Sequence, residues 1–203
     1  ECFAKVTAAD PKNMDLCIDV YFEMLSAGYK EHADTYLQSN EEVRSMVMAI
    51  YSCFYDYRRL YPYITDIMTD NFYCSYPSLG VNEFATGTQN ALSEHVLHKW
   101  SNDFLAIARA NFLIKKLKGN EAIEEKVRTE AEAEARFLRG LFYLDLVTFY
   151  GRVPLINEDS PMEDMPREEI SKVLGQCKAD AEFAAANLTN QTDPQKASVG
   201  AAL

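Results

Sequence analysis

Residues 129–156 of this chain read TEAEAEARFLRGLFYLDLVTFYGRVPLI, and this stretch decides the fold. Its apolar side chains recur at steps of three and four residues, which places them on one face of a helix: Ala135, Leu138, Phe142, Leu146 and Phe149. Gly151 can take the left-handed conformation that ends a helix, and Pro154 prevents the helix from continuing. The stretch therefore predicts a long amphipathic helix over Thr129–Tyr150, followed by a short extended segment.

The same periodicity predicts three further helices, over Asn40–Leu60, Ser93–Leu117 and about Pro166–Leu188. Ser39 and Glu42 have the spacing of a capping box at the start of the first of them. In the last, proline stands where the first turn of a helix tolerates it. We therefore expect an all-α protein whose helices are separated by long loops.

The two ends of the chain are less regular than its middle. Residues 1–38 show only a weak apolar stripe, near Asp15–Ala27, and we separate them as an N-terminal segment from a helical domain over residues 39–203. Ala197–Leu203 is typical of the first turns of another helix. We therefore expect the domain to be truncated at its C-terminal end, within a larger fold.

The composition is that of a globular protein with a marked negative charge. The 203 residues are 48% hydrophobic and 25% charged, and the formal net charge is -11. This charge disfavours nucleic acids and anionic lipid surfaces, both of which would repel the chain. No apolar run reaches the roughly 20 residues that span a bilayer. A neutral, polyhydroxylated partner meets no such electrostatic barrier.

Patterns for catalysis or metal binding are weak. The five cysteines lack paired spacing, and His95 and His98 are not accompanied by the acidic residue of a metalloprotease helix. A glycosidase needs two carboxylates about 5–9 Å apart across a cleft. The acidic pairs of this chain are instead expected on solvent-facing helix surfaces: Glu130/Glu134 and Glu168/Glu169. We expect no catalytic residue, no metal and no cofactor.

Two helices carry the residue pattern of a tetratricopeptide (TPR) repeat. Gly140-x-x-Tyr143 matches the small-then-large pair of its first helix, and Ala179-x-x-x-Phe183-x-x-Ala186 matches its second helix. The small residues allow the helices to approach closely while aromatic rings fill the space beside them. A plain antiparallel helix pair would explain the same residues, because the segment between the two patterns is long for such a repeat.

The best binding candidate is the aromatic loop within residues 62–92, at Asp70-Asn71-Phe72-Tyr73-Cys74-Ser75-Tyr76-Pro77. A tyrosine ring can lie flat against the C–H face of a sugar, while aspartate and asparagine form hydrogen bonds with hydroxyl groups. The predicted ligand-binding residues are therefore Asp70, Asn71, Tyr73 and Tyr76. In the alternative interpretation, Phe72 and Tyr73 only fix the loop to the helices.

Three polar residues fall beside predicted core positions. Asn111 is in step with apolar residues of its helix, so if buried it must be hydrogen-bonded, and we expect it to hold neighbouring backbone. Arg136 and Arg139 are expected to extend their stems over the core and to pair with acids such as Asp145 or Glu132.

Several motifs, in order, resemble the SusD/RagB family of nutrient-binding lipoproteins. The most specific is A-R-F-L-R…Y-G-x-V-P-L, within the Glu132–Ile156 segment. Others are Ser39-Asn-Glu-Glu-Val-Arg, the acidic step over Asp66–Asn71, and Trp100 followed by Ile107-Ala-Arg-Ala-Asn111. The resemblance continues in a final group: Pro166-Arg-Glu-Glu-Ile, Asp180-x-Glu-x-Ala-x-x-x-Leu188 and Lys196-Ala-Ser-Val-Gly-Ala-Ala-Leu203.

The resemblance implies an α-helical fold with TPR-like helix pairs. It also implies a non-catalytic lipoprotein on the outer face of the outer membrane of Bacteroidetes, which binds glycans and delivers them to a SusC-like TonB-dependent transporter. Its contact with the membrane would be a lipid anchor that is not visible in this chain. Two alternatives remain open at this stage: a TPR-like scaffold that holds a protein partner, and a glycosidase with paired acids.

Overall fold

The computed structural model describes residues 37–54, 65–69, 81–160, 165–188 and 196–202. These ranges contain six helices, in this order: α3 (Asn40–Tyr51), α5 (Asn82–Thr86), α6 (Glu94–Leu117), α7 (Glu125–Tyr150), α8 (Ile170–Asn187) and α9 (Val199–Ala202). They contain no β-strand, only an isolated antiparallel bridge between Pro154 and Arg167. The prediction of an all-α protein is confirmed.

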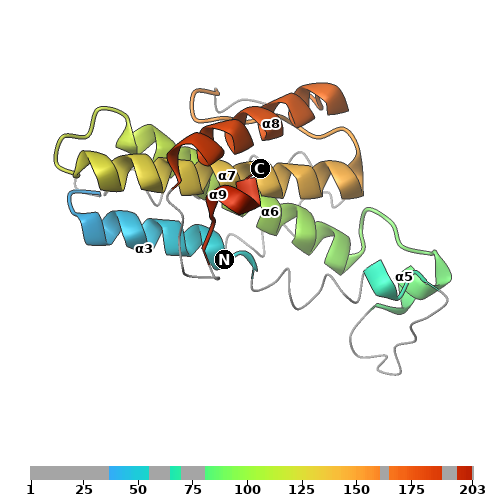
Figure 1. Ribbon diagram of the computed structural model, residues 1–203. Coiled ribbons are helices and arrows are strands. Elements are labelled where there is room, and N and C mark those ends of the chain that lie inside the picture. The colour runs from blue at the N-terminus through green and yellow to red at the C-terminus, as the bar shows by residue number, and fades with distance from the viewer. Residues whose placement is uncertain (1–36, 55–64, 70–80, 161–164, 189–195, 203) are drawn as a thin grey trace.

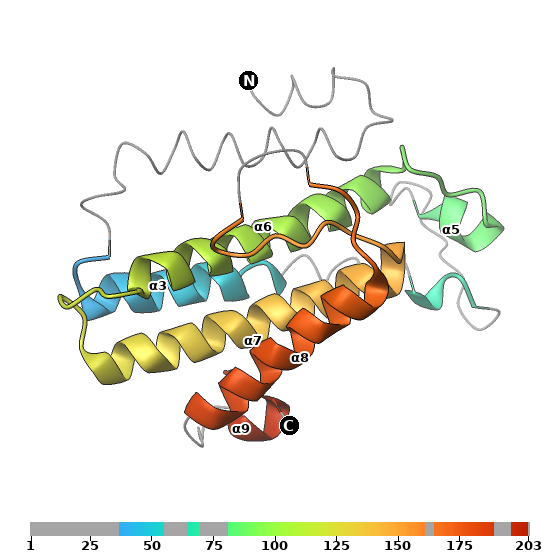
Figure 2. The same cartoon turned by 90° about the horizontal axis from the view of Figure 1, so that it is seen from above.

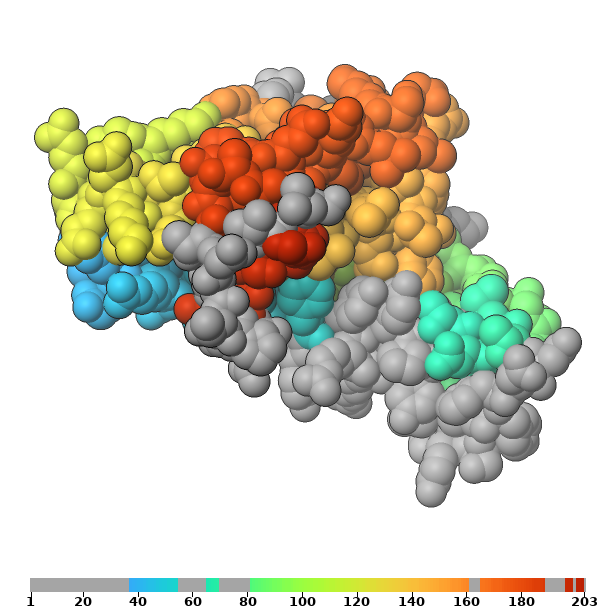
Figure 3. Space-filling model, viewed as in Figure 1, coloured from blue at the N-terminus to red at the C-terminus, as the bar shows by residue number. Residues whose placement is uncertain are grey.

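Two long antiparallel helices, α6 and α7, form the centre of the molecule (Figures 1 and 2). In Figure 1, α3 and α8 lie on opposite sides of α7, and α8 runs back along α7 in the opposite direction. The short helix α5 stands at the end of the molecule where α6 begins. The space-filling view in Figure 3 shows α7 and α8 on one broad face, with α5 projecting from its end.

The core lies where α3, α6, α7 and α8 meet, and it is rich in aromatic rings. Trp100, Phe104 and Phe142 are each 1% exposed. The rings of Phe104 and Tyr143 meet edge to face with centroids 6.4 Å apart, and Phe54 stacks on Phe142 at 4.7 Å. Burying one such side chain stabilises the fold by about 1.5–3 kcal/mol. The apolar stripe of residues 129–156 therefore faces this core, as its periodicity predicts.

A capping side chain sets the start of α3, and a backbone bridge sets the start of α8. Ser39 caps α3 by accepting a hydrogen bond from the Glu42 amide at 3.2 Å, as the capping-box spacing predicts. Helix α7 begins one turn before the predicted Thr129. Helix α8 begins at Ile170, so the expected first-turn position of Pro166 is wrong. The cause is the extended pairing of Arg167 with Pro154, which keeps the chain out of the helical conformation there.

The helix ends are set by glycine and by local turns. Gly151 has φ 72° and ψ -119°, a conformation that glycine adopts most readily, and it ends α7 as predicted. Helix α3 ends at Tyr51, before the predicted Leu60, because a turn follows at once; residues 55–64 lie outside the described part of the chain. The expected helix start at Ala197–Leu203 is present as α9.

The predicted pairing of α7 with α8 is confirmed at Gly140. The small residues predicted for the same contact on α8, Ala179 and Ala186, are instead exposed. A Cβ atom at Gly140 would lie 3.3 Å from the carbonyl oxygen of Cys177 and 3.4 Å from the Cβ of Asp180. Tyr143, one turn later, is fully buried beside this contact. Gly140 therefore sets the distance between the two helices.

We expect Gly140→Val to destabilise the protein by about 1–3 kcal/mol, because its methyl groups would overlap the α8 backbone. The control is Gly175→Ala on α8, where an added Cβ meets nothing within 4 Å. That change is expected to stabilise the helix by up to about 1 kcal/mol. Urea unfolding followed by circular dichroism measures both. Equal stability of Gly140→Val and wild type would contradict the close packing.

Candidate functional site

The predicted ligand-binding residues Asp70, Asn71, Tyr73 and Tyr76 lie in residues 70–80, outside the part of the chain that the structure describes. Residues 65–69 precede this segment and residues 81–160 follow it. Ile67 and Val81 are 2% and 1% exposed and belong to one apolar cluster. The residues that flank the predicted site on either side therefore lie together in one buried cluster.

This place, which we call the loop base, consists of Ile67, Val81 and Phe84, with Val96 of α6 and Phe149 of α7 packed against them. One hydrogen bond joins α5 to the residue that precedes α6, and a second holds the turn between the two helices. The Ser93 hydroxyl donates to the Glu83 carboxylate at 2.7 Å and accepts from the Asn90 amide at 2.9 Å. The loop base is therefore attached to the long central helices and does not stand alone.

A buried charge cluster adjoins the loop base. The Lys99 ammonium on α6 donates to the Asp103 carboxylate at 2.9 Å and also to Asp145 on α7, and all three side chains are at most 10% exposed. The same ammonium lies 4.6 Å from the ring centroid of Phe149, a residue of the loop base. We call Lys99, Asp103 and Asp145 the α6–α7 charge cluster.

One ammonium serves two carboxylates in this cluster, so its charges do not balance. Burial raises the pKa of Asp103 to about 7, although the charge and hydrogen bond of Lys99 act in the opposite direction. Burial and the nearby charges of Asp103 and Asp145 also raise the pKa of Tyr150, whose phenol therefore stays protonated and donates to the Val96 carbonyl at 2.8 Å.

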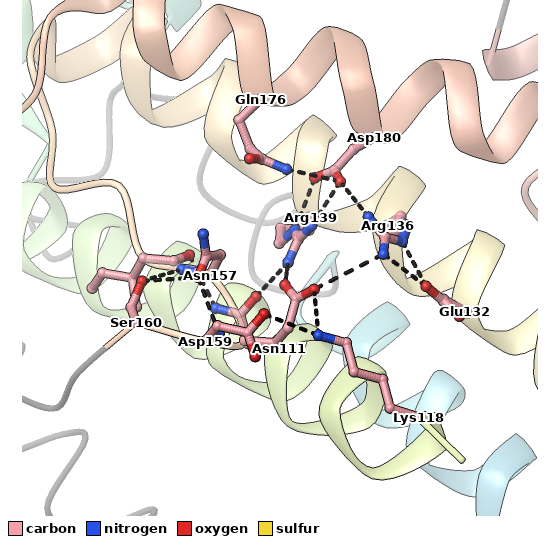
Figure 4. A network of polar contacts seen from close by, with 12 residues as sticks. Asn111, Lys118, Glu132, Arg136, Arg139, Asn157, Asp159, Ser160, Gln176 and Asp180 are labelled. Atoms are coloured by element: carbon pink, nitrogen blue, oxygen red, sulfur yellow. Dashed lines mark hydrogen bonds and ion pairs between the residues drawn. The ribbon is translucent and has the colours of Figure 1, made fainter. Parts of the chain in front are cut away.

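A second polar network surrounds Arg139, at the contact between α7 and α8 (Figure 4). The guanidinium is 1% exposed and makes two hydrogen bonds with Asp180 of α8, at 2.8 and 2.7 Å. Its other terminal nitrogen donates to Glu158 at 2.6 Å and to the Asn111 side-chain oxygen at 2.7 Å. Arg139 thereby joins α6, α7, α8 and the segment that follows α7.

The segment after α7 is fixed by its backbone at Ile156. The Asn111 amide donates to the Ile156 carbonyl at 3.0 Å, which confirms the prediction that Asn111 holds backbone. The buried Tyr143 hydroxyl donates to the same carbonyl at 2.8 Å and accepts from the Ile156 amide at 2.7 Å. Each of these buried polar groups therefore has a partner, as burial requires.

Glu158 in the Arg139 network is not poised to act as a general acid. Burial would raise the pKa of Glu158, but the hydrogen bonds and charges of Arg139 outweigh it and lower that pKa to about 2. A general acid near neutral pH needs a carboxyl whose pKa is close to the working pH. Glu158 stays ionised and serves to hold its segment in place.

The expected pairing of Arg136 with Glu132 is confirmed at 2.7 Å. The expectations for Arg139 are wrong. It pairs with Asp180 and Glu158, and Asp145 forms its ion pair with Lys99 instead. Arg139 is enclosed by the helix contact and does not extend over the core surface.

Glu134 was expected on a solvent face but is 7% exposed. It accepts a hydrogen bond from the Tyr51 hydroxyl at 3.0 Å, and burial raises its pKa. Within the described ranges, no group of three or more possible metal-binding side chains occurs.

The residues that the sequence analysis missed are Lys99, Asp103 and Asp180. A signal for them exists in the sequence. Asp180 falls in step with the apolar residues Val173 and Ala184 of its helix, and Asp103 falls in step with the apolar residues of α6. A charged residue within an apolar stripe predicts a buried partner of opposite charge on a neighbouring helix.

We expect Arg139→Met to destabilise the protein by about 3–5 kcal/mol, because it leaves the fully buried Asp180 carboxylate without its main cation. The double variant Arg139→Met/Asp180→Leu removes both members of this pair and should recover part of the loss, since Glu158 still lacks its Arg139 partner. Chemical unfolding of both variants beside wild type measures the difference. A double variant no more stable than the single one would show that the pair is not the cause.

The lowered pKa of Glu158 predicts a specific acid sensitivity. A carboxylate whose pKa is depressed in the fold stabilises the protein above its unfolded pKa, and this contribution disappears as the pH falls toward the folded value of about 2. Because Glu158 is partly solvated, we expect Glu158→Gln to be about 1–2 kcal/mol less stable than wild type at pH 7. The difference in stability should shrink below about pH 4.5 and disappear only near pH 2. The exposed Glu182→Gln is the control and should match wild type throughout.

Comparison with known proteins places this geometry in a family. Residues 25–202 match the SusD-like family model, described as starch-binding and associating with the outer membrane. A SusD-like protein of Bacteroides ovatus is 27% identical over 196 residues, which cover 92% of this chain and 35% of that protein. A SusD-like protein of Formosa agariphila is 26% identical, and the match covers 77% of this chain and 32% of that protein. The chain thus spans about a third of the length of these relatives.

Solved structures agree with the sequence match. A laminarin-binding SusD-like protein superposes with a TM-score of 0.69 at 26% identity, over 80% of this chain and 38% of that one. A structure solved with a xylogluco-oligosaccharide gives a TM-score of 0.67 at 26% identity, over 79% of this chain and 32% of that one. The resemblance noted in the sequence is confirmed, and with it the TPR-like all-α fold: this chain belongs to the SusD-like family.

Proposed function

We propose that this chain is part of a non-catalytic protein that binds neutral oligosaccharides at the cell surface. The observation that carries the proposal is the family match over residues 25–202, which includes both the aromatic segment 70–76 and its base. One similar protein is a laminarin-binding SusD-like protein, and another similar structure was solved with a xylogluco-oligosaccharide. A neutral glycan also suits a chain with a formal net charge of -11, because it meets no electrostatic repulsion.

In this proposal Tyr73 and Tyr76 stack against sugar rings while Asp70 and Asn71 form hydrogen bonds with hydroxyl groups. The described residues support it indirectly. The two ends of the segment are buried together at the loop base, so a ligand bound by the segment would be held against α6 and α7. The polar networks described above have their groups paired with one another, which favours binding over catalysis.

Export and transport belong to the same proposal. We infer a position on the outer face of the outer membrane, reached through a lipid anchor, and delivery of the glycan to a SusC-like TonB-dependent transporter. The family description supports the outer-membrane association. Among the described helices, none combines the length and the apolar character that crossing a bilayer requires.

A second candidate function, a scaffold for a protein partner, is favoured by one observation. Helices α7 and α8 carry large hydrophobic side chains that are 38–47% exposed: Leu141, Leu144, Ile170 and Leu174. Exposed apolar groups of this kind are common at protein contacts. A pull-down from membranes distinguishes the two functions: recovery of a soluble partner and of no transporter favours the scaffold.

The glycan-binding proposal predicts that Tyr76→Ala weakens binding at least about fivefold, and Tyr73→Ala similarly, because each change removes a stacking surface. Isothermal titration with laminarin and with a xyloglucan oligosaccharide measures this. Met48→Ala is the control, since Met48 is an exposed side chain on α3. Undiminished binding by both tyrosine variants would remove the segment from the site.

A further inference from the structure

The α6–α7 charge cluster and the loop base share one side chain. The ring of Phe149 packs against the loop base on one side and lies 4.6 Å from the Lys99 ammonium on another. An ammonium over an aromatic face is attracted to it, and the attraction is stronger where water is excluded. Lys99 is only 8% exposed, so this contact is largely shielded from solvent. The position of the Phe149 ring is therefore linked to the position of the ammonium.

The ammonium in turn is held by two carboxylates on different helices. Asp103 is on its own helix, one turn further along, and Asp145 is on α7, one turn before Phe149. When both carboxylates are ionised the buried group carries one net negative charge. When one is protonated it is neutral, and Lys99 can pair fully with the other carboxylate.

We propose that the α6–α7 charge cluster positions the loop base through Phe149, and that the protonation of Asp103 changes how firmly the base is held. The effect on glycan affinity rests on the function proposed above, whereas the effect on the loop base does not. Phe149 and Lys99 act here as positioning residues, because neither is placed in contact with the glycan.

The groups that face Asp103 determine the direction of the pH effect. Among the described residues they include Lys99 on α6 and, on α7, Asp145 and the Tyr150 phenol, while the Arg167 guanidinium covers the adjacent Trp100 ring at 5.4 Å. Asp103 is 1% exposed, and its raised pKa of about 7 favours the protonated, neutral cluster below neutral pH. A raised acid pKa stabilises the fold at low pH and loses that contribution as pH rises. The loop base is therefore held more firmly at pH 6 than at pH 8.

Hydrogen exchange of residues 81–99 at pH 6 and pH 8, corrected for intrinsic exchange rates, tests the inference without a ligand. We expect wild type to be about threefold less protected at pH 8. Asp103→Asn imitates the protonated carboxyl and should be equally protected at both values. The single tryptophan, Trp100, provides a second readout, with a fluorescence transition near pH 7 that the variant lacks. A variant with the same pH dependence as wild type would overturn the inference.

The role of the ring is tested by Phe149→Leu, which keeps an apolar side chain but removes the aromatic face. We expect about fivefold weaker binding of laminarin or the xyloglucan oligosaccharide, and a lower protection of residues 81–99. The matched control is Phe112→Leu, which removes the ring of the Lys116–Phe112 pair elsewhere on α6. For the Asp103→Asn variant the matched control is Asp159→Asn, which also removes one carboxylate but lies outside the charge cluster.

The outcomes separate the two proposals. If neither glycan binds wild type, the proposed function fails for these glycans, while hydrogen exchange still decides whether the charge cluster holds the loop base. If a glycan binds with equal affinity at pH 6 and pH 8 and equally well to Phe149→Leu, control of affinity by the charge cluster is excluded, and glycan binding itself stands.

Discussion

The buried guanidinium of Arg139 is the interaction on which the arrangement of helices depends. A charge in this position costs several kcal/mol unless partners surround it. Its partners come from three other parts of the chain: Asp180 on α8, Asn111 on α6 and Glu158 in the segment after α7. The network is complete only when all these elements are in place. Gly140, beside it on α7, allows α8 to come close enough for Asp180 to reach the guanidinium.

Such a network specifies an arrangement more than it stabilises one, since well-packed apolar residues can replace a buried ion pair at little cost. The same holds for the α6–α7 charge cluster, which lies nearer the end of the molecule where α5 projects. The two groups fix the central helices at separate points along α7. One holds α8 and the segment after α7, and the other adjoins the base of the aromatic segment.

The sequence predicts the fold where its information is local. The periodic apolar stripes predict α6 and α7. The position of Asn111 on an apolar helix face predicts that its side chain forms a hydrogen bond with neighbouring backbone. Predictions fail where distant residues decide the outcome. The partner of Arg139 is 41 residues away, and the start of α8 is displaced by a bridge to Pro154. Glu134 looks like a surface residue until Tyr51, 83 positions earlier, is packed against it.

For the candidate site too, the sequence predicts what depends on local residue types and misses what depends on distant contacts. Composition and ring chemistry single out the aromatic segment, because stacking and hydrogen bonding to sugars need particular residue types and no particular partner. The cluster at its base could not be predicted, because Ile67, Val81 and Phe149 are far apart in the sequence and meet only in the folded chain. Within the proposed function, a ligand bound by this segment would depend on how firmly the loop base is held. Buried charges that the ligand never touches would then affect its affinity, since preorganisation lowers the cost of binding.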